Sequence, residues 1–387
     1  MSEAAIDAYQ MYRHLRHSNP VSKEPDGPWQ VACYEDVRTV LRDQKAFSSD
    51  VAQRAPDDKR APSMLFSDPP VHSRLRKLVS RAFSPNRIAT QREPIAQRCE
   101  QLMTEMAKHD QIDLISALAA PLPVTVIAAM LGVEDGNMNK FKYWSDAIFG
   151  NIGDILFAQP TPEVEEASAE MNAYFTQKIE ELRKHPQDHL LGNLIETETE
   201  DGKLSNEELL SFCALLLIAG NETTTGLILG SVRVFHEMPE TFDQLKANPD
   251  LIPTFIEETL RFYSPFSMTV RRATCDVELG GQLIKAGELV LPLMASANRD
   301  ETIFTNPDEF IIDRSPNPHL GFGSGIHNCL GAALARLEGE IAVRGFIKHF
   351  DSISIETHDP VTLSQFGGPD SLLINLNRAN SQEILPC

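Results

Sequence analysis

The sequence predicts a mainly α-helical fold with small β-sheets to one side, and three observations lead to this prediction. Apolar residues recur at spacings of three and four over most of residues 70–245, as amphipathic helices require. Ser205 and Glu208 form a capping-box pair ahead of a run of about 30 residues that is apolar on nearly all sides, so we expect a long, buried central helix there. Residues 268–296 alternate apolar and polar side chains around a Gly-Gly turn, which is typical of short strands.

The other elements follow in order along the chain. Residues 1–48 combine a short helix with a strand-like stretch, WQVACY, and a second helix, EDVRTVLRD. A length of 387 residues suggests two or three domains, but no linker, long charge run or repeat divides the chain, so we expect a single domain over 1–387. The helix-rich core is expected at about 70–265 and 328–350, and the β-rich parts at about 28–48, 268–296 and 352–378.

The longest charge-free run, residues 114–133, has the length of a membrane span. Pro121 and Pro123 lie near its middle and acidic residues flank both ends, so we expect two buried helical pieces with a break at the prolines. The N-terminus lacks the basic-then-apolar pattern of a signal peptide, and the cysteines lack the spacing of a disulfide framework. These features predict a cytoplasmic protein without a membrane span.

The overall charge is strongly negative, with 35 Lys and Arg against 55 Asp and Glu and a formal net charge of −20. Such a surface repels nucleic acid and anionic membranes, so neither is an expected partner. Positive charge gathers in one stretch, because six basic residues and no acidic residue lie between Val71 and Arg92.

A cysteine ends a glycine-rich loop, GFGSGIHNCLG at residues 321–331, just before the helix-like run AALARLEGEIA. The dipole and free N–H groups of a helix start favour a thiolate, which is either a nucleophile or a metal ligand. A nucleophile usually needs an orienting His–acid pair, and zinc needs several N and S ligands. His327 is close, but no second Cys or His gives a zinc spacing. The remaining chemistry is a single axial thiolate on a haem iron, with a plain buried thiol as the alternative.

The stretch FGSGIHNCLG resembles the haem-binding signature of the cytochrome P-450 superfamily, Phe-x-x-Gly-x-x-x-Cys-x-Gly, at Phe322, Gly325, Cys329 and Gly331. Three more motifs occur in the order of that family: DPPVHSRLR resembles its His-x-x-x-Arg, AGNETT its oxygen-activation motif, and EETLR its Glu-x-x-Arg. The resemblance covers essentially the whole chain. It implies the cytochrome P-450 fold, with haem b held between a long central helix and the helix after the Cys loop.

The resemblance also implies roles for individual residues. Cys329 is expected to be the axial ligand of the iron, and Arg271 is preferred over Arg272 because the family places its arginine two residues before an alanine, here Ala273. The groups expected to contact haem are His72, Arg76, Ala219, Gly220, Arg271, Phe322, Gly323, His327, Cys329 and Gly331. Four of them, His72, Arg76, Arg271 and His327, are expected to bind the two haem propionates, which are carboxylates. Those expected to form a buried structural network that holds the Cys loop are Glu258, Arg261 and Arg314.

The stretch LLLIAGNETTT interrupts the apolar central helix. From the residues alone, a functional site and a helix bend in which Thr bonds back to an earlier carbonyl are equally open. The resemblance implies that Glu222 and Thr223 are catalytic: Thr223 donates a hydrogen bond to bound oxygen and Glu222 relays protons. It also implies that Gly220 leaves room for O₂.

The expected function is a monooxygenase that inserts one atom of O₂ into an apolar substrate, such as a fatty acid, terpenoid or steroid. Electrons from NAD(P)H are expected to arrive through a separate ferredoxin and its reductase, with Arg74, Lys77 and Arg81 as a docking patch on a monomeric enzyme. The alternatives are a peroxide-using or biosynthetic coupling P-450 and a non-catalytic haem protein. Candidate substrate-contacting residues are Leu65, Phe66, Leu216, Ala219, Phe266, Met268 and Phe366.

Overall fold

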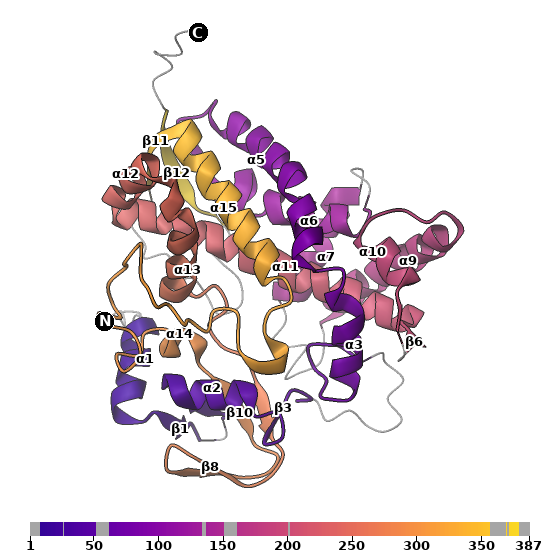
Figure 1. Cartoon of the computed structure of the whole chain (residues 1–387), viewed down its shortest axis with the longest axis vertical. Helices are drawn as coiled ribbons and strands as arrows, with labels where there is room; N and C mark the ends of the chain where they lie inside the picture. The colour runs from indigo at the N-terminus through magenta and orange to yellow at the C-terminus, as the bar shows by residue number, and fades with distance from the viewer. Residues whose placement is uncertain are drawn as a thin grey trace.

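The computed structural model describes residues 8–25, 27–51, 62–133, 137–150, 161–199, 202–356, 369 and 371–378. Helices make up most of the molecule and the strands gather toward its margins, as the sequence predicts (Figure 1). The helices are α1 (Ala8–Ser18), α2 (Tyr34–Arg42), α3 (Val71–Ser80), α4 (Pro85–Thr90), α5 (Arg92–Met106), α6 (Pro121–Met130), α7 (Met138–Gly150), α9 (Pro162–Lys184), α10 (Leu190–Glu196), α11 (Asn206–Glu237), α12 (Pro239–Ala247), α13 (Ile252–Tyr263), α14 (Met294–Ala297) and α15 (Ala332–His349).

Within the described residues the strands form four small sheets. The largest has the order β1-β2-β10-β7-β3, so it joins strands from two of the segments that were expected to be β-rich, about 28–48 and 268–296, and β1 just before the first of them. Its strands are β1 (Val21–Lys23), β2 (Trp29–Val31), β3 (Phe47–Ser48), β7 (Arg271–Ala273) and β10 (Leu289–Pro292). The others are β4 (Gln111–Asp113), β11 (Phe350–Ile355) and β12 (Leu373–Arg378) in one sheet, and the pairs β5 (Glu198–Thr199) with β6 (Gly202–Lys203) and β8 (Val277–Leu279) with β9 (Gln282–Ile284).

Helix α11 runs through the middle of the molecule, and α6, α7, α13 and α15 pack against it (Figure 1). Its start is fixed as predicted: Ser205 accepts a hydrogen bond from the Glu208 backbone N–H, and the Glu208 side chain accepts one from the Ser205 N–H. By length and composition this helix alone among the described residues is apolar enough to cross a membrane. Its central position explains that character, because the core helix of a globular fold is apolar on all sides.

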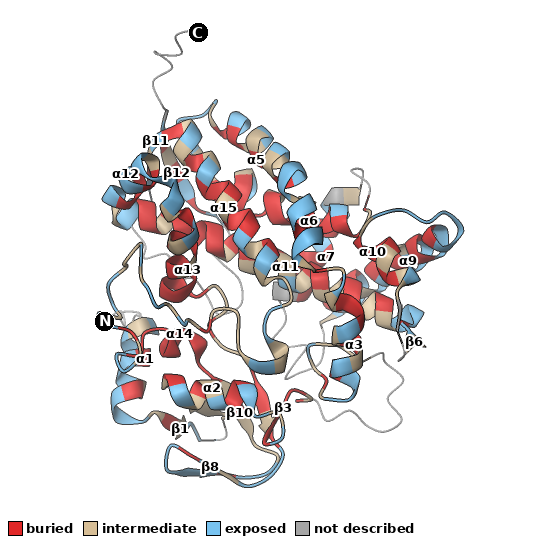
Figure 2. Cartoon of the chain, viewed as in Figure 1, coloured by how far each residue is buried: buried red, intermediate tan, exposed pale blue. Residues whose placement is uncertain are grey.

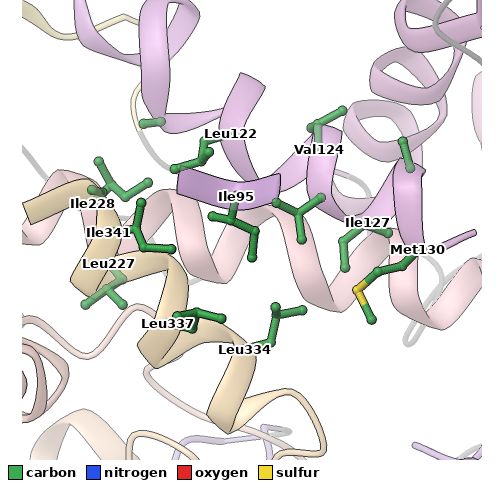
Figure 3. Close-up of a cluster of buried hydrophobic side chains, with 14 of the residues drawn as sticks. Ile95, Leu122, Val124, Ile127, Met130, Leu227, Ile228, Leu334, Leu337 and Ile341 are labelled. Carbon is green, nitrogen blue, oxygen red and sulfur yellow. The ribbon is translucent and has the colours of Figure 1, made fainter. Parts of the chain in front are cut away.

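The charge-free run 114–133 divides as predicted. A π-helical turn (Ile115–Ala119) is followed by α6, which begins at Pro121, where a proline is favoured because the N–H that it lacks has no helical partner. Buried side chains of α6 then meet those of α5, α11 and α15 in one cluster (Figure 3). Burial is concentrated along α11, α13 and α15, while α1, α5 and α9 expose one face (Figure 2). The site described next lies at the start of α15.

Candidate active site around Cys329

The loop that carries Cys329 is closed on itself. The Cys329 backbone N–H donates to the carbonyl oxygen of Phe322 at 2.9 Å. Gly323 and Gly325 have φ angles of 69° and 76°, which side chains rarely tolerate. A Cβ atom on Gly325 would also lie 2.8 Å from the Leu41 carbonyl oxygen of α2. Two of the glycines that mark the loop in the sequence are therefore required by its backbone.

The sulfur of Cys329 has opposing influences on its pKa. Burial is the largest and raises it, whereas the backbone N–H groups of Gly331 and Ala332 and the charges of Arg76 and Arg336 lower it. The N–H groups at the helix start act in the expected direction, but burial outweighs them and the net pKa is raised. Cys329 is nevertheless an exposed residue, so protein surrounds its sulfur but leaves it accessible to a ligand. A metal cation would supply the missing stabilisation, because a coordinated thiol loses its proton.

Basic side chains from three parts of the chain meet beside this loop. His72 is buried on α3, and its ring centroid lies 4.2 Å from that of His327. Burial, followed by the charges of Arg271, His72 and Arg76, lowers the pKa of His327 to about 3. Burial also lowers the pKa of Arg271 to about 10. The four residues that the sequence assigned to haem carboxylates are thus assembled in one place.

This basic cluster has unfilled hydrogen-bonding capacity. Among the described residues, both ring nitrogens of His72 and Nε2 of His327 are buried without a partner. Arg271, which is 6% exposed, donates within the described residues only to the Thr269 hydroxyl and the Val270 carbonyl. Buried polar groups without hydrogen-bond partners are costly, and two carboxylates placed here would accept hydrogen bonds from Arg271 and from the imidazole N–H groups. A thiol and an anion-binding cluster on adjoining elements therefore fit a haem with its iron at Cys329 and its propionates at the cluster.

The choice between the two neighbouring arginines is also decided by geometry. Arg272 points away from the cluster and donates to the carbonyl oxygens of Val51 and Gly287. Arg271, by contrast, acts on the pKa of both His72 and His327. Arg271 is therefore the arginine that faces the basic cluster.

The middle of α11 has an open face. Ala219 is exposed and Thr223, one turn later, is only partly buried, although the helix around them is mostly buried. The Thr223 hydroxyl donates to the Ala219 carbonyl oxygen at 2.8 Å, which is the backbone interaction that the sequence left open. Ala219 and Thr223 are four residues apart and share this face of the helix, so the face offers a small side chain and a hydroxyl group to a ligand.

Glu222 lies on the side of α11 that faces α7. Burial raises its pKa, the nearby Asp146 raises it further, and Lys142 lowers it. Lys142 and Asp146 form an ion pair of 2.6 Å whose side chains are about half exposed. Next to Glu222, the buried Asn221 donates to Ser145 at 2.8 Å and fixes the two helices together. Glu222 is therefore a carboxyl that tends to keep its proton and lies near the surface of α7.

The role expected of Gly220 stays a prediction, and the structure gives the glycine a packing role. A Cβ atom on Gly220 would lie 2.7 Å from Cδ1 of Ile127, so the missing side chain makes room for α6. The helix assignment also continues without a break from Asn206 to Glu237. Ala219, rather than Gly220, is the small residue on the open face.

The three residues assigned to a structural network are joined in the core. The Glu258 and Arg261 side chains are fully buried, and two hydrogen bonds of 2.8 Å connect them. Arg314 donates to the same carboxylate at 3.0 and 3.1 Å. This geometry excludes the weak surface pair that the i,i+3 spacing alone would allow. A charged group this deep requires such pairing, since an uncompensated buried charge is costly.

The network reaches the Cys loop through the irregular segment that precedes it. Arg261 also donates to the carbonyl oxygens of Asn298, Pro307 and Glu309. The side-chain oxygen of Asn298 in turn accepts from the Leu320 N–H at 2.7 Å, directly before the loop. The network therefore positions the loop indirectly. It contacts the backbone of the segment that precedes the loop and acts on Cys329 through that segment.

Comparison with known proteins decides the family. Residues 29–375 match the family model described as Cytochrome P450. The chain belongs to the cytochrome P450 family.

Individual P450s are similar over nearly their full length. The chain is 39% identical over 377 residues to the putative cytochrome P450 YjiB of Bacillus subtilis, which covers 96% of this chain and 94% of that protein. It is 37% identical to CYP109E1 of Bacillus megaterium in complex with testosterone, with a TM-score of 0.86 and coverage of 96% and 100%. It is 34% identical to P450BioI in complex with an acyl carrier protein carrying hexadec-9Z-enoic acid, with a TM-score of 0.88 and coverage of 97% and 100%.

The residues expected to contact substrate in this P450 are scattered. Leu65 is 38% exposed, Phe66 is partly buried, and Leu216 lies in the main core. Phe266 packs on the core of the large sheet, and Met268 packs in the small cluster around Tyr12 and Leu293. The substrate role of these residues stays a prediction; Ala219 is on the open face and Phe366 lies outside the described residues.

The basic stretch of the P450 is less uniform than its sequence suggests. Arg74 forms an ion pair with Glu208 at the start of α11, so it is not a free charge of the predicted docking patch. Lys77 and Arg81 are exposed. This pairing could not be predicted from the sequence, since 134 residues separate its partners.

Two further residues of the P450 site were missed. Arg336 on α15 lies 4.5 Å from the ring centroid of Phe322 and pairs with Glu257 at 2.7 and 2.8 Å, so it braces the Cys loop from the outside. Asp146 acts on Glu222 from α7. A basic residue one turn after the loop was a visible signal for the first, whereas nothing in the sequence indicated the second.

Proposed function

We propose that this P450 is a monooxygenase in which Cys329 is the axial ligand of haem b and the basic cluster binds the propionates. The supporting observation is that an accessible thiol and a set of buried basic donors without carboxylate partners adjoin one another. Phe322, Gly323 and Gly331 belong to the loop that carries Cys329. When bound, the haem supplies the activation of O₂, and its thiolate ligand favours cleavage of the O–O bond.

The protein's own contribution to catalysis is to hold and move protons. Splitting O₂ with formation of water consumes two protons, so an acid and a hydroxyl near the site are chemically required. The raised pKa of Glu222 keeps a proton on its carboxyl group near neutral pH more often than an exposed glutamate would. The Thr223 hydroxyl needs only a rotation away from the Ala219 carbonyl to donate to a ligand on the open face.

The electron supply is proposed to be a ferredoxin with an NAD(P)H-dependent reductase. Lys77 and Arg81, which are exposed, are the proposed docking residues of the basic stretch. A negative partner would be steered to them against the overall charge of −20. We propose a monomeric cytoplasmic enzyme that forms a single domain.

The proposed substrates are apolar small molecules: fatty acids, terpenoids or steroids. Two of the similar P450s support this range, since CYP109E1 binds testosterone and P450BioI binds a fatty acyl chain on its carrier protein.

Carbon monoxide binding tests the haem ligand. Reduced holoenzyme with carbon monoxide is expected to absorb near ~450 nm, because the axial ligand sets haem electronics. Cys329→His is expected to move the band to shorter wavelength, and Cys275→Ser, which changes an exposed thiol elsewhere, is expected to leave it in place. A histidine-type band in freshly prepared parent protein would contradict the assignment.

A further inference from the structure

Asp68 lies just before α3, next to the segments that supply the basic cluster. Its carbonyl oxygen accepts a hydrogen bond from the His72 N–H at 2.9 Å, so its backbone belongs to the first turn of α3. Its carboxylate accepts one from the Ser48 hydroxyl and another, at 3.0 Å, from the Ser49 N–H. Asp68 therefore fastens the start of α3 to the end of β3 (Figure 1).

Strand β3 extends this connection to the arginine of the cluster. Ser48 lies opposite Arg272 in the antiparallel pair of β3 and β7. Arg271, the first residue of β7, comes directly before that position and is buried. The carboxylate of Asp68 thus joins the helix that carries His72 to the strand that carries Arg271. These two residues are far apart in the sequence, so their approach depends on contacts of this kind.

The residue before Asp68 contacts the third segment, the Cys loop. Burial is the largest influence on the pKa of the His327 ring and lowers it, whereas a hydrogen bond with the Ser67 backbone raises it. Ser67 is itself buried, and its hydroxyl donates to the Ser63 carbonyl oxygen at 2.7 Å. Two consecutive residues, Ser67 and Asp68, therefore contact all three segments from which the basic cluster is built.

The Asp68 carboxylate also offsets positive charge without occupying the donors of the cluster. Burial lowers the pKa of both His72 and Arg271, and the nearby charge of Asp68 acts on both in the opposite direction. The carboxylate oxygens are taken by Ser48 and Ser49. Within the described residues no hydrogen bond or ion pair joins Asp68 to His72 or Arg271. The donors stay available to the haem carboxylates while a negative charge remains close.

We propose that Asp68 is a positioning residue of the haem site: it ties α3 to β3, so that His72 and Arg271 meet at the propionates, and its charge lowers the reduction potential of the haem. This inference rests on the proposed function and adds a residue to its site. A negative charge near the haem favours the ferric state, because that state carries one more positive charge than the ferrous state. The tie and the charge affect different measurements and can be tested separately.

The test follows two properties of the holoenzyme, the rate of haem transfer to excess apomyoglobin and the reduction potential of the haem. Asp68→Ala removes both hydrogen bonds and is expected to lose haem roughly tenfold faster, the effect of about one hydrogen bond to a charged group. Ser48→Ala breaks the tie and keeps the charge. Haem transfer from this variant is expected to be faster than from the parent, and its potential is expected to be unchanged.

Asp68→Asn separates the charge from the tie. Its amide group can accept from the Ser49 N–H and donate to the Ser48 hydroxyl oxygen, so the connection between α3 and β3 is retained. This variant is expected to hold haem as the parent does and to have a higher reduction potential. A residue with a purely structural role would not change the potential in this way.

Asp113 provides the matched control. Its carboxylate also accepts from a serine hydroxyl and from the next backbone N–H, those of Ser371 at 3.3 Å and Leu372 at 2.8 Å. It belongs to β4, whose sheet contains β11 and β12 rather than β3 and β7. Asp113→Ala and Asp113→Asn are expected to leave both the haem-transfer rate and the reduction potential unchanged.

Either of two results would overturn the inference: haem transfer from Asp68→Ala and Ser48→Ala at the rate of the parent, or an unchanged potential in Asp68→Asn. If Asp68→Ala does not fold, Ser48→Ala and Asp68→Asn decide the question. A ferrous–carbon monoxide band near ~450 nm in the parent shows that the proposed function stands when this inference fails. Without that band in the parent, the proposed function and the inference both fail.

Discussion

The carboxyl group of Glu338 is buried in a place that disfavours its charged form. It is 1% exposed on α15, and its Oε2 has no hydrogen-bond partner among the described residues. Burial alone raises its pKa to about 8. The proposed mechanism does not use this group, so its replacement tests the electrostatic reasoning without touching the site.

The magnitude follows from proton linkage. The unfolded chain releases the Glu338 proton near pH 4.5, and the folded protein near pH 8. Between these values the folded state binds more protons, so stability is greatest below pH 4.5 and falls until about pH 8. At pH 7 the cost of keeping the proton is about 3 kcal/mol, at about 1.4 kcal/mol per pH unit. Glu338→Gln removes this cost, while any loss from an unsatisfied amide is the same at every pH.

The assay is urea unfolding of equally haem-loaded parent and Glu338→Gln protein from pH 5 to pH 8, followed by tryptophan fluorescence. The stability of the variant relative to the parent is expected to rise by about 3 kcal/mol across this range, since the linked cost grows with pH. Glu340→Gln is the control, because Glu340 is two residues away, pairs with Arg92 and Arg344, and has a lowered pKa. A difference between Glu338→Gln and parent that does not change with pH would refute the reasoning.

Three other outcomes are expected. Thr223→Ala should bind substrate nearly as the parent does but divert electrons to hydrogen peroxide; equal product per NAD(P)H in both proteins would contradict this. Gly220→Ala should lower the unfolding free energy by about 1–3 kcal/mol, because its Cβ would lie 2.7 Å from Ile127 in a packed core; an unchanged urea midpoint would show that α6 moves freely. Charge reversal at Lys77 and Arg81 should slow ferredoxin-driven reduction at low salt, where steering is strongest, and leave dithionite reduction unchanged; equal ferredoxin rates would exclude docking there.

Local patterns predicted the elements that depend on neighbours in sequence. The capping box at Ser205 and Glu208, the break before α6 and the i,i+3 pairing of Glu258 with Arg261 all occur as expected, because each is set within one helical turn. The Cys loop could be predicted from the sequence for the same reason. Its backbone has positive φ angles at Gly323 and Gly325, which favour glycine, so the loop is marked by its glycines.

Interactions between distant residues could not be predicted in the same way. Gly220 was assigned to oxygen because its motif gave a role, and only the position of Ile127 on another helix shows what its missing side chain accommodates. The charge of Arg74 is offset by Glu208, 134 residues away. The rise in the pKa of Cys329 could not be predicted for a related reason, since the extent of burial depends on every element around the loop.

The Glu258–Arg261–Arg314 network has a consequence for how the protein opens. Residues 298–324, all of them described, contain no helix or strand, so a regular ladder of hydrogen bonds does not protect their amides. Their order depends instead on side-chain donors anchored in α13, such as Arg261 to Pro307 and Glu309. Local opening of this segment must break buried charge contacts. The opening of a single residue on its own is therefore disfavoured. The segment and α13 should consequently exchange hydrogen as one cooperative unit, which gives an irregular stretch of chain the kinetic protection of a core helix.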